Sequence, residues 1–161
     1  MKRTSGFLRA FSALKSILFS KKVQIDNITI QGSEEFLKKV SVALELLKER
    51  DLEVYKITNE SLDWIIEGQS TMLSLTRWGG TLSLGGEQVD SSQTWLAGLL
   101  AYQGSRSGLY LENLSKNSNS HKVPKEFYSG DKVWNMRYES LQRLGASYEE
   151  LKRLADFIET K

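Results

Sequence analysis

A chain of 161 residues, of which 40% are hydrophobic and 26% charged, is typical of one globular domain with a substantial core. The absence of cysteine excludes disulfides, thiolate zinc sites and a cysteine nucleophile. The single histidine, His121, excludes most metal sites and acid–base schemes that require imidazole, and no run of about 20 apolar residues predicts a transmembrane helix. The net charge is +2, but residues 1–22 carry +6, so the remainder of the chain carries −4.

The first 22 residues are predicted to form a basic amphipathic helix, separate from a domain at residues 23–161. Arg9 and Lys15 interrupt the apolar core that a secretory signal peptide requires. Two other interpretations stay open. The helix can lie on an anionic membrane surface or contact a protein partner, or it can pack on the domain body. Its apolar face consists of Phe7, Leu8, Phe11, Leu14, Ile17 and Leu18.

The domain is predicted to begin with a strand and a helix. Residues 23–31 are rich in β-branched side chains and alternate in part, which favours a strand bent at Asp26-Asn27. Ser33 can cap a helix whose apolar stripe extends to about Arg50. Residues 52–57 fit either a short strand or a first helical turn, and the apolar spacing after residue 61 predicts a helix that ends near Gly68.

A hairpin and the remaining helices follow. Residues 71–84 predict two strands joined at Gly79-Gly80, because a glycine pair suits the positive φ angles of a tight turn. Residues 113–125 are polar and contain the only proline, which predicts a loop. Residues 131–144 predict a helix that Gly145 ends, and the capping box at residues 147–150 begins the last helix.

The central element is a predicted helix at residues 92–107. Its first half is apolar on one face and belongs inside the domain. Its second half carries a polar cluster that includes Tyr102, Gln103 and Arg106, and buried polar groups are costly unless they have partners. This cluster is therefore the candidate site. The order of elements predicts a single α+β domain, with a small antiparallel sheet and its hairpin packed against several helices.

The central helix also carries a family resemblance. Residues 95–107 read Trp-Leu-Ala-Gly-Leu-Leu-Ala-Tyr-Gln-Gly-Ser-Arg-Ser. They resemble the pattern Trp-Leu-Ala-x-Leu-Leu-Val-His-Glu-Ala-x-His-Ser of zincin-type metallopeptidase domains of bacteria. A second match comprises residues 128–131 (Tyr-Ser-Gly-Asp) and residues 141–146 (Leu-Gln-Arg-Leu-Gly-Ala). The resemblance extends over residues 28–158 and implies a zincin-like domain. Its third metal ligand would be an acidic residue on the penultimate helix, where Asp131 is the nearest carboxylate.

The chain departs from the family at each position that carries chemistry. Tyr102 and Arg106 replace the two histidines that would bind zinc, and Gln103 replaces the glutamate that would take a proton from the metal-bound water. An amide has no titratable proton, and a guanidinium stays protonated. We therefore expect no metal, no cofactor and no peptidase activity. A carboxylate such as Asp131 or Glu112 is expected to pair with Arg106, with Tyr102 and Gln103 completing a polar network.

These observations predict a pseudoenzyme, a non-catalytic relative of a metallopeptidase that acts as a binding or scaffolding protein. Residues 1–22 would contact a membrane surface or a protein partner. Because basic residues do not cluster outside this segment, we expect no nucleic-acid partner. We expect a cytoplasmic protein, with attachment to a membrane surface as an option.

Three alternatives stay open. The substituted positions could line a cleft that binds an anion or a peptide. The chain could also be a hydrolase with a rearranged active site in the same cleft, using His121 with Glu126 or Asp131. Ser105 with His121 is a further nucleophile and base of this kind.

Overall fold

A computed structural model describes residues 20–116 and 131–159 and has an α+β fold, as the sequence predicts. The predicted helix at residues 1–22 lies almost wholly outside the described residues. His121 and Glu126 lie outside them too, as does most of the predicted loop at residues 113–125.

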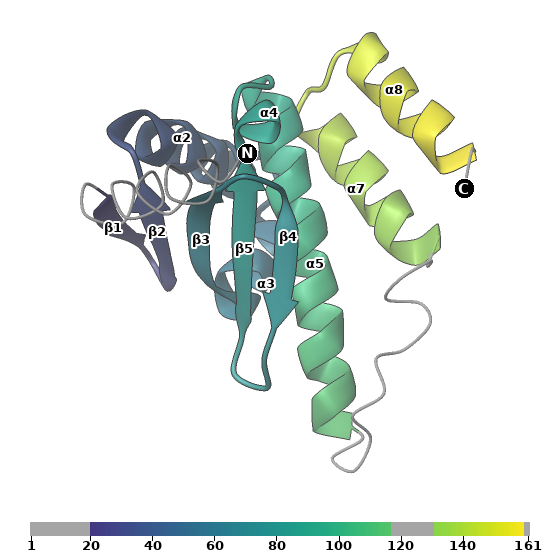
Figure 1. Cartoon of the computed structure of the whole chain (residues 1–161). Coiled ribbons are helices and arrows are strands. Elements are labelled where there is room, and N and C mark those ends of the chain that lie inside the picture. Colours follow the sequence, from purple (N-terminus) through teal and green to yellow (C-terminus); the bar gives the residue numbers. More distant parts are fainter. Residues whose placement is uncertain (1–19, 117–130, 160–161) are drawn as a thin grey trace, which may run out of the picture.

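The described residues form one five-stranded sheet in the order β1-β2-β3-β5-β4 (Figure 1). β1 pairs with β2 and β4 with β5 in antiparallel fashion, whereas β2 with β3 and β3 with β5 are parallel. The sheet is therefore mixed, and the predicted antiparallel sheet is wrong in this respect. Helices between β2 and β3 supply the crossover that a parallel pair requires. The strands are β1 (Lys21–Ile25), β2 (Ile28–Gly32), β3 (Leu62–Gly68), β4 (Met72–Leu75) and β5 (Gly80–Gly85).

Helices cover one face of the sheet, and a helical pair extends the fold to one side (Figure 1). α5 is central, because it contacts α2 and α3 beside the sheet and α7 on its other flank, and α8 packs on α7. The bounds are α2 (Glu34–Arg50), α3 (Leu52–Ser61), α4 (Gly86–Val89), α5 (Gln93–Lys116), α7 (Asp131–Arg143) and α8 (Tyr148–Glu159).

The hydrophobic core lies between the sheet and these helices. Alternate residues of β2 and β5 are fully buried, as the two-residue period of a strand requires. The same cluster includes the apolar stripe of α2 and the first half of α5, which places the predicted central helix inside the domain. Its members include Ile28, Ile30, Leu82, Leu84, Val40, Leu44, Leu47, Leu96 and Leu100.

Two local predictions are corrected in the first half of the domain. Residues 23–31 form two strands, because the chain turns at Asp26, whose φ is +48°. Residues 62–68 form β3 and not a helix. The pairing of β3 with β5 shifts register between Leu62 and Trp64, which breaks the two-residue alternation. Because of this irregularity, Leu62, Trp64, Ile65 and Ile66 have a spacing in the sequence that resembles one face of a helix.

The predicted hairpin is confirmed, but its glycines have a different role. The connection runs through Thr76–Gly79, where the Thr76 hydroxyl donates to the Gly79 carbonyl (2.9 Å) and accepts from its amide (3.2 Å). A Cβ at Gly79 would lie 2.2 Å from an oxygen of Asp63. Gly79 has no positive φ angle, and its lack of a side chain instead leaves room for the Asp63 carboxylate.

Candidate functional site

The predicted polar cluster lies on the second half of α5. Gln103 is buried, with 6% of its surface exposed, and its Oε1 accepts a hydrogen bond from Nη1 of Arg106 at 3.0 Å. The Arg106 guanidinium also lies 5.5 Å from the centre of the Tyr102 ring. Tyr102, Gln103 and Arg106 are thus brought together. Of the two predicted carboxylates, Glu112 forms an ion pair with Lys116 (2.5 Å), and the Asp131 side chain lies outside the described structure.

Close contacts with α3 hold this turn of α5 in place. The Ser61 hydroxyl donates to the Gly104 carbonyl (2.9 Å), and the Ser107 hydroxyl donates to the Ser61 carbonyl (2.7 Å). A Cβ at Gly104 would lie 2.2 Å from the Thr58 hydroxyl oxygen, so only glycine permits this approach. The cluster is therefore positioned by the close packing of α3 against α5.

A second group of residues comes from α7 and faces the same turn. Trp134 stacks on Tyr102 with ring centres 4.5 Å apart, and Arg137 is buried with 6% of its surface exposed. The guanidinium carbon of Arg137 lies 4.7 Å from the ring centre of Trp95, 5.5 Å from that of Tyr102 and 5.9 Å from that of Trp134. Three aromatic faces thus surround one buried cation.

The electrostatics of Arg137 are unfavourable among the described residues. Burial lowers the pKa of its guanidinium to about 10, and the nearby cation of Arg153 adds to this effect, while Tyr102 opposes it. The guanidinium remains protonated at neutral pH. Its Nε is buried without a hydrogen-bond partner, and none of the ion pairs found in the described regions includes it.

These residues line a pocket of about 320 Å³ between α5, α7 and α8, which we call the Arg137 pocket. Its walls are mostly apolar and aromatic, and Arg153 on α8 contributes a second guanidinium, 4.8 Å from the ring centre of Trp95. No acidic side chain occurs among the described residues that line it. The neutral polar groups are those of Thr71, Gln88, Tyr102 and Gln103.

The donor set of α5 does not fit the zinc ion that the resemblance implies. Arg106 presents only N–H donors, and the Gln103 oxygen that faces it already accepts one of them. Burial raises the pKa of the Tyr102 hydroxyl, although Arg106 and Arg137 oppose the shift, so Tyr102 is not a phenolate ligand at neutral pH. Within the described ranges, no three His, Cys, Asp or Glu side chains are grouped as metal ligands.

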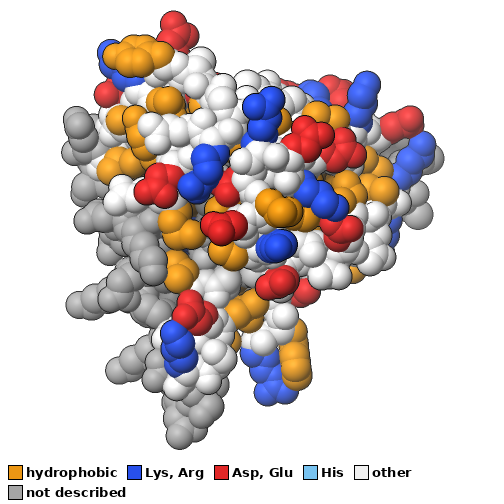
Figure 2. Space-filling view, turned by 180° about the vertical axis from the view of Figure 1, so that it is seen from behind, with side chains coloured by type: hydrophobic (Ala, Val, Ile, Leu, Met, Phe, Trp, Pro, Cys, Tyr) orange, Lys and Arg blue, Asp and Glu red, His pale blue; other side chains and the backbone are white. Residues whose placement is uncertain are grey.

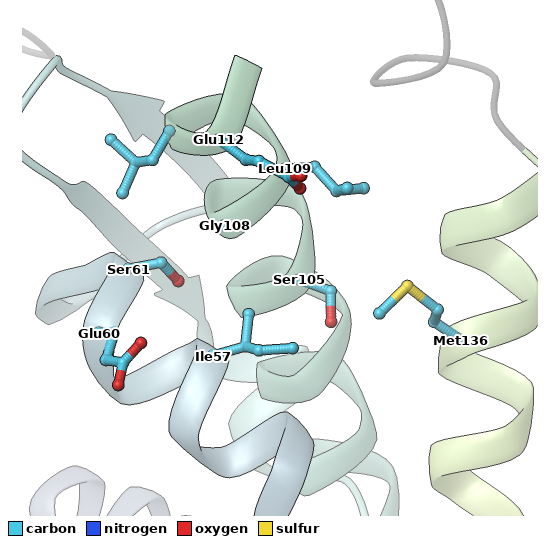
Figure 3. Close-up of a pocket in the computed structure, with 9 residues that line it drawn as sticks. Ile57, Glu60, Ser61, Ser105, Gly108, Leu109, Glu112 and Met136 are labelled. Carbon is cyan, nitrogen blue, oxygen red and sulfur yellow. The ribbon is translucent and has the colours of Figure 1, made fainter. Parts of the chain in front are cut away.

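A second cavity, of about 330 Å³, lies between α3, α5 and α7 (Figure 3). Ser105 is 2% exposed, and its hydroxyl lines this cavity without a hydrogen-bond partner. Figure 3 shows Met136 of α7 and Ile57 of α3 directed toward the same space. The base proposed for Ser105, His121, lies outside the described residues.

Arg137 and Arg153 were not predicted as site residues from the sequence. The available signal was Arg137 itself, a charged residue at an inward position of an otherwise apolar helix stripe (Trp134, Leu141 and Leu144). The contact of Arg153 with Trp95 depends on how α8 docks, and no local pattern reveals it.

In the two described segments, no helix combines the length and apolarity needed to cross a bilayer. The chain matches no protein-family model, no curated protein and no solved structure.

Proposed function

We propose that this chain is a non-catalytic binding protein, a degenerate zincin-like domain that holds a ligand or partner where a peptidase would hold its substrate. The observation that carries the proposal is the hydrogen bond between Arg106 and Gln103. Gln103 stands at the general-base position of the family pattern, and its amide oxygen accepts this hydrogen bond. Arg106, which donates it, stands where the resemblance implies a metal ligand and carries a permanent positive charge.

The surroundings of this hydrogen bond favour binding. Tyr102 and Gln103 both line the Arg137 pocket, whose volume and mostly apolar walls are typical of sites for small ligands. The described residues of the pocket include no carboxylate or imidazole that could move a proton at neutral pH.

Residues 1–22 are proposed to contact an anionic membrane surface or a protein partner, as their basic amphipathic sequence suggests. A nucleic-acid partner is not part of the proposal. On the helix-bearing face, side chains of Lys and Arg are interspersed with those of Asp and Glu (Figure 2). A nucleic-acid interface would instead have a continuous basic surface.

The test is a metal and activity assay on the purified full chain. After incubation with zinc and dialysis, we expect less than stoichiometric zinc by mass spectrometry and no cleavage of a mixed peptide library. Stoichiometric zinc together with peptide cleavage would overturn the proposal. Loss of that activity in His121→Ala would favour the alternative, a hydrolase with a rearranged active site.

A further inference from the structure

Arg137 is a buried cation whose counter-charge the described residues do not provide. A buried charge is costly unless it is paired and hydrogen-bonded. The rings of Trp95, Tyr102 and Trp134 stabilise the guanidinium through their faces, but a neutral ring cannot accept the in-plane N–H groups as an anion does. The parallel N–H groups of the planar Arg137 guanidinium therefore match the two oxygens of a planar anion, such as a carboxylate, that enters the pocket.

Arg153 is a second cation that would be stabilised by an anion in this pocket. The guanidinium of Arg153 lies 4.8 Å from the ring centre of Trp95, against 4.7 Å for that of Arg137. Arg153 is exposed, so it lies at the entrance while Arg137 lies within. Two like charges beside one ring repel each other, and a bound anion would replace this repulsion with attraction.

The neutral polar groups add hydrogen-bond donors. Oε1 of Gln88 accepts from the indole N–H of Trp95 at 3.3 Å, and Oε1 of Gln103 accepts from Arg106. Each of these two side chains also carries an NH₂ group, which is a hydrogen-bond donor. The pocket is thus rich in donors, while Leu99, Leu154 and the aromatic rings give it apolar walls.

We propose that the Arg137 pocket binds a carboxylate attached to an apolar group. Arg137 donates hydrogen bonds to the carboxylate, and the aromatic walls enclose the apolar group. This rests on the proposed function, since it names the ligand class of a site that binds without cleaving. The carboxylate can belong to a small free acid or to the C-terminus of a peptide that ends in an apolar residue. Inorganic phosphate would satisfy the cations but leave the apolar walls without contacts.

The first experiment uses the full chain and matched ligands in isothermal titration calorimetry. Hydrocinnamate is compared with its uncharged amide, hydrocinnamamide, and with inorganic phosphate. We expect the amide to bind roughly 10- to 100-fold more weakly, the range for losing hydrogen bonds to a charged group, and phosphate to bind more weakly than hydrocinnamate. Equal affinity for hydrocinnamate and its amide overturns the inference, and so does a failure to bind both hydrocinnamate and a peptide with a free C-terminal phenylalanine.

The source of the carboxylate is distinguished by two peptides. Ala-Ala-Ala-Phe with a free C-terminus is compared with the same peptide amidated. Tighter binding of the free peptide than of hydrocinnamate assigns a peptide C-terminus, and the reverse order assigns a small acid. Mass spectrometry of the same mixtures tests the proposed function separately. Cleaved peptide would refute non-catalytic binding, whereas absent binding with intact peptide would refute only the carboxylate site.

Variants place the ligand at Arg137. Arg137→Met is expected to abolish acid-specific binding without lowering the melting temperature, since it removes a buried charge at similar volume. Arg153→Gln weakens binding by a smaller factor, and the matched control Lys152→Gln on the same helix leaves it unchanged. If Arg137→Met does not fold, Arg137→Lys provides the test, because lysine keeps the positive charge but cannot donate two parallel hydrogen bonds to a carboxylate. Undiminished binding by Arg137→Met, or by Arg137→Lys in that case, overturns the assignment.

Discussion

At the scale of single residues, Gln103 and its hydrogen-bond partner Arg106 define the polar cluster on α5. Its amide is buried, and the Arg106 guanidinium satisfies its oxygen at 3.0 Å. A carboxylate at this position would attract the same guanidinium, but it could then act as a base only after losing that partner. The chemistry of the site therefore depends on the pair of residues.

Arg106→Leu tests this pair. We expect the free energy of unfolding to fall by about 1–2 kcal/mol, because the buried Gln103 oxygen loses its donor. Urea denaturation monitored by tryptophan fluorescence measures the change. Arg77→Leu, a loss of the same charge at the exposed hairpin, is the control and should shift stability less. An unchanged Arg106→Leu variant would count against a structural network.

At the scale of elements, capping residues were the most predictable feature. Ser33 caps α2 by accepting from the Phe36 amide at 3.3 Å, as expected. The predicted box at residues 147–150 is confirmed. The Ser147 amide donates to the Glu150 carboxylate (2.9 Å), and the Glu150 amide donates to the Ser147 hydroxyl (3.2 Å). Such contacts involve residues only a few positions apart, so sequence reveals them.

The carboxylate of Glu150 also couples α8 to α5, because it accepts a hydrogen bond from the Ser92 hydroxyl. Burial raises the pKa of Glu150, but the hydrogen bonds from Ser92 and Ser147 outweigh it and hold that pKa below its usual value of 4.5. A group with a lowered folded-state pKa stabilises the protein above its unfolded-state pKa. That stabilisation is lost as pH falls through the folded-state value.

Glu150→Gln should therefore lower the unfolding free energy by about 1 kcal/mol at neutral pH, with the deficit disappearing between about pH 5 and pH 3. Thermal denaturation of wild type and variant across this range measures the deficit. Glu149→Gln removes the adjacent exposed carboxylate and should show no comparable dependence. A deficit that stays constant with pH would contradict the role assigned to the Glu150 charge.

At the scale of the whole molecule, charge is divided between two parts of the sequence, with +6 in residues 1–22 and −4 in the remainder. This asymmetry predicts attraction of the chain to anionic lipid through its first residues, since each basic side chain near such a surface contributes about 1 kcal/mol.

A full-length variant tests this attraction while leaving the described domain intact. Replacing Lys2, Arg3, Arg9 and Lys15 with glutamine should abolish co-sedimentation with vesicles that contain phosphatidylserine. Neither protein should sediment with neutral phosphatidylcholine vesicles. Equal sedimentation of both proteins with anionic vesicles would exclude these side chains as the anchor.

The sequence by itself determined the α+β class, the helix at residues 34–50, the hairpin and the helix caps. Each depends on contacts or periodicity within a few residues, so a short window contains the signal. It also identified Tyr102, Gln103 and Arg106 as a cluster, because they lie on consecutive turns of one helix.

Only the tertiary structure decided that residues 62–68 are a strand and that the sheet is mixed. The parallel partners of β3 lie in distant segments, and its irregular register disguised the alternation. Tertiary packing likewise brought Trp134 and Arg137 of α7 against Tyr102 of α5. An inward charge can be noticed in a sequence, but its aromatic surroundings, and the lack of a counter-charge for it among the described residues, become apparent only where three helices meet.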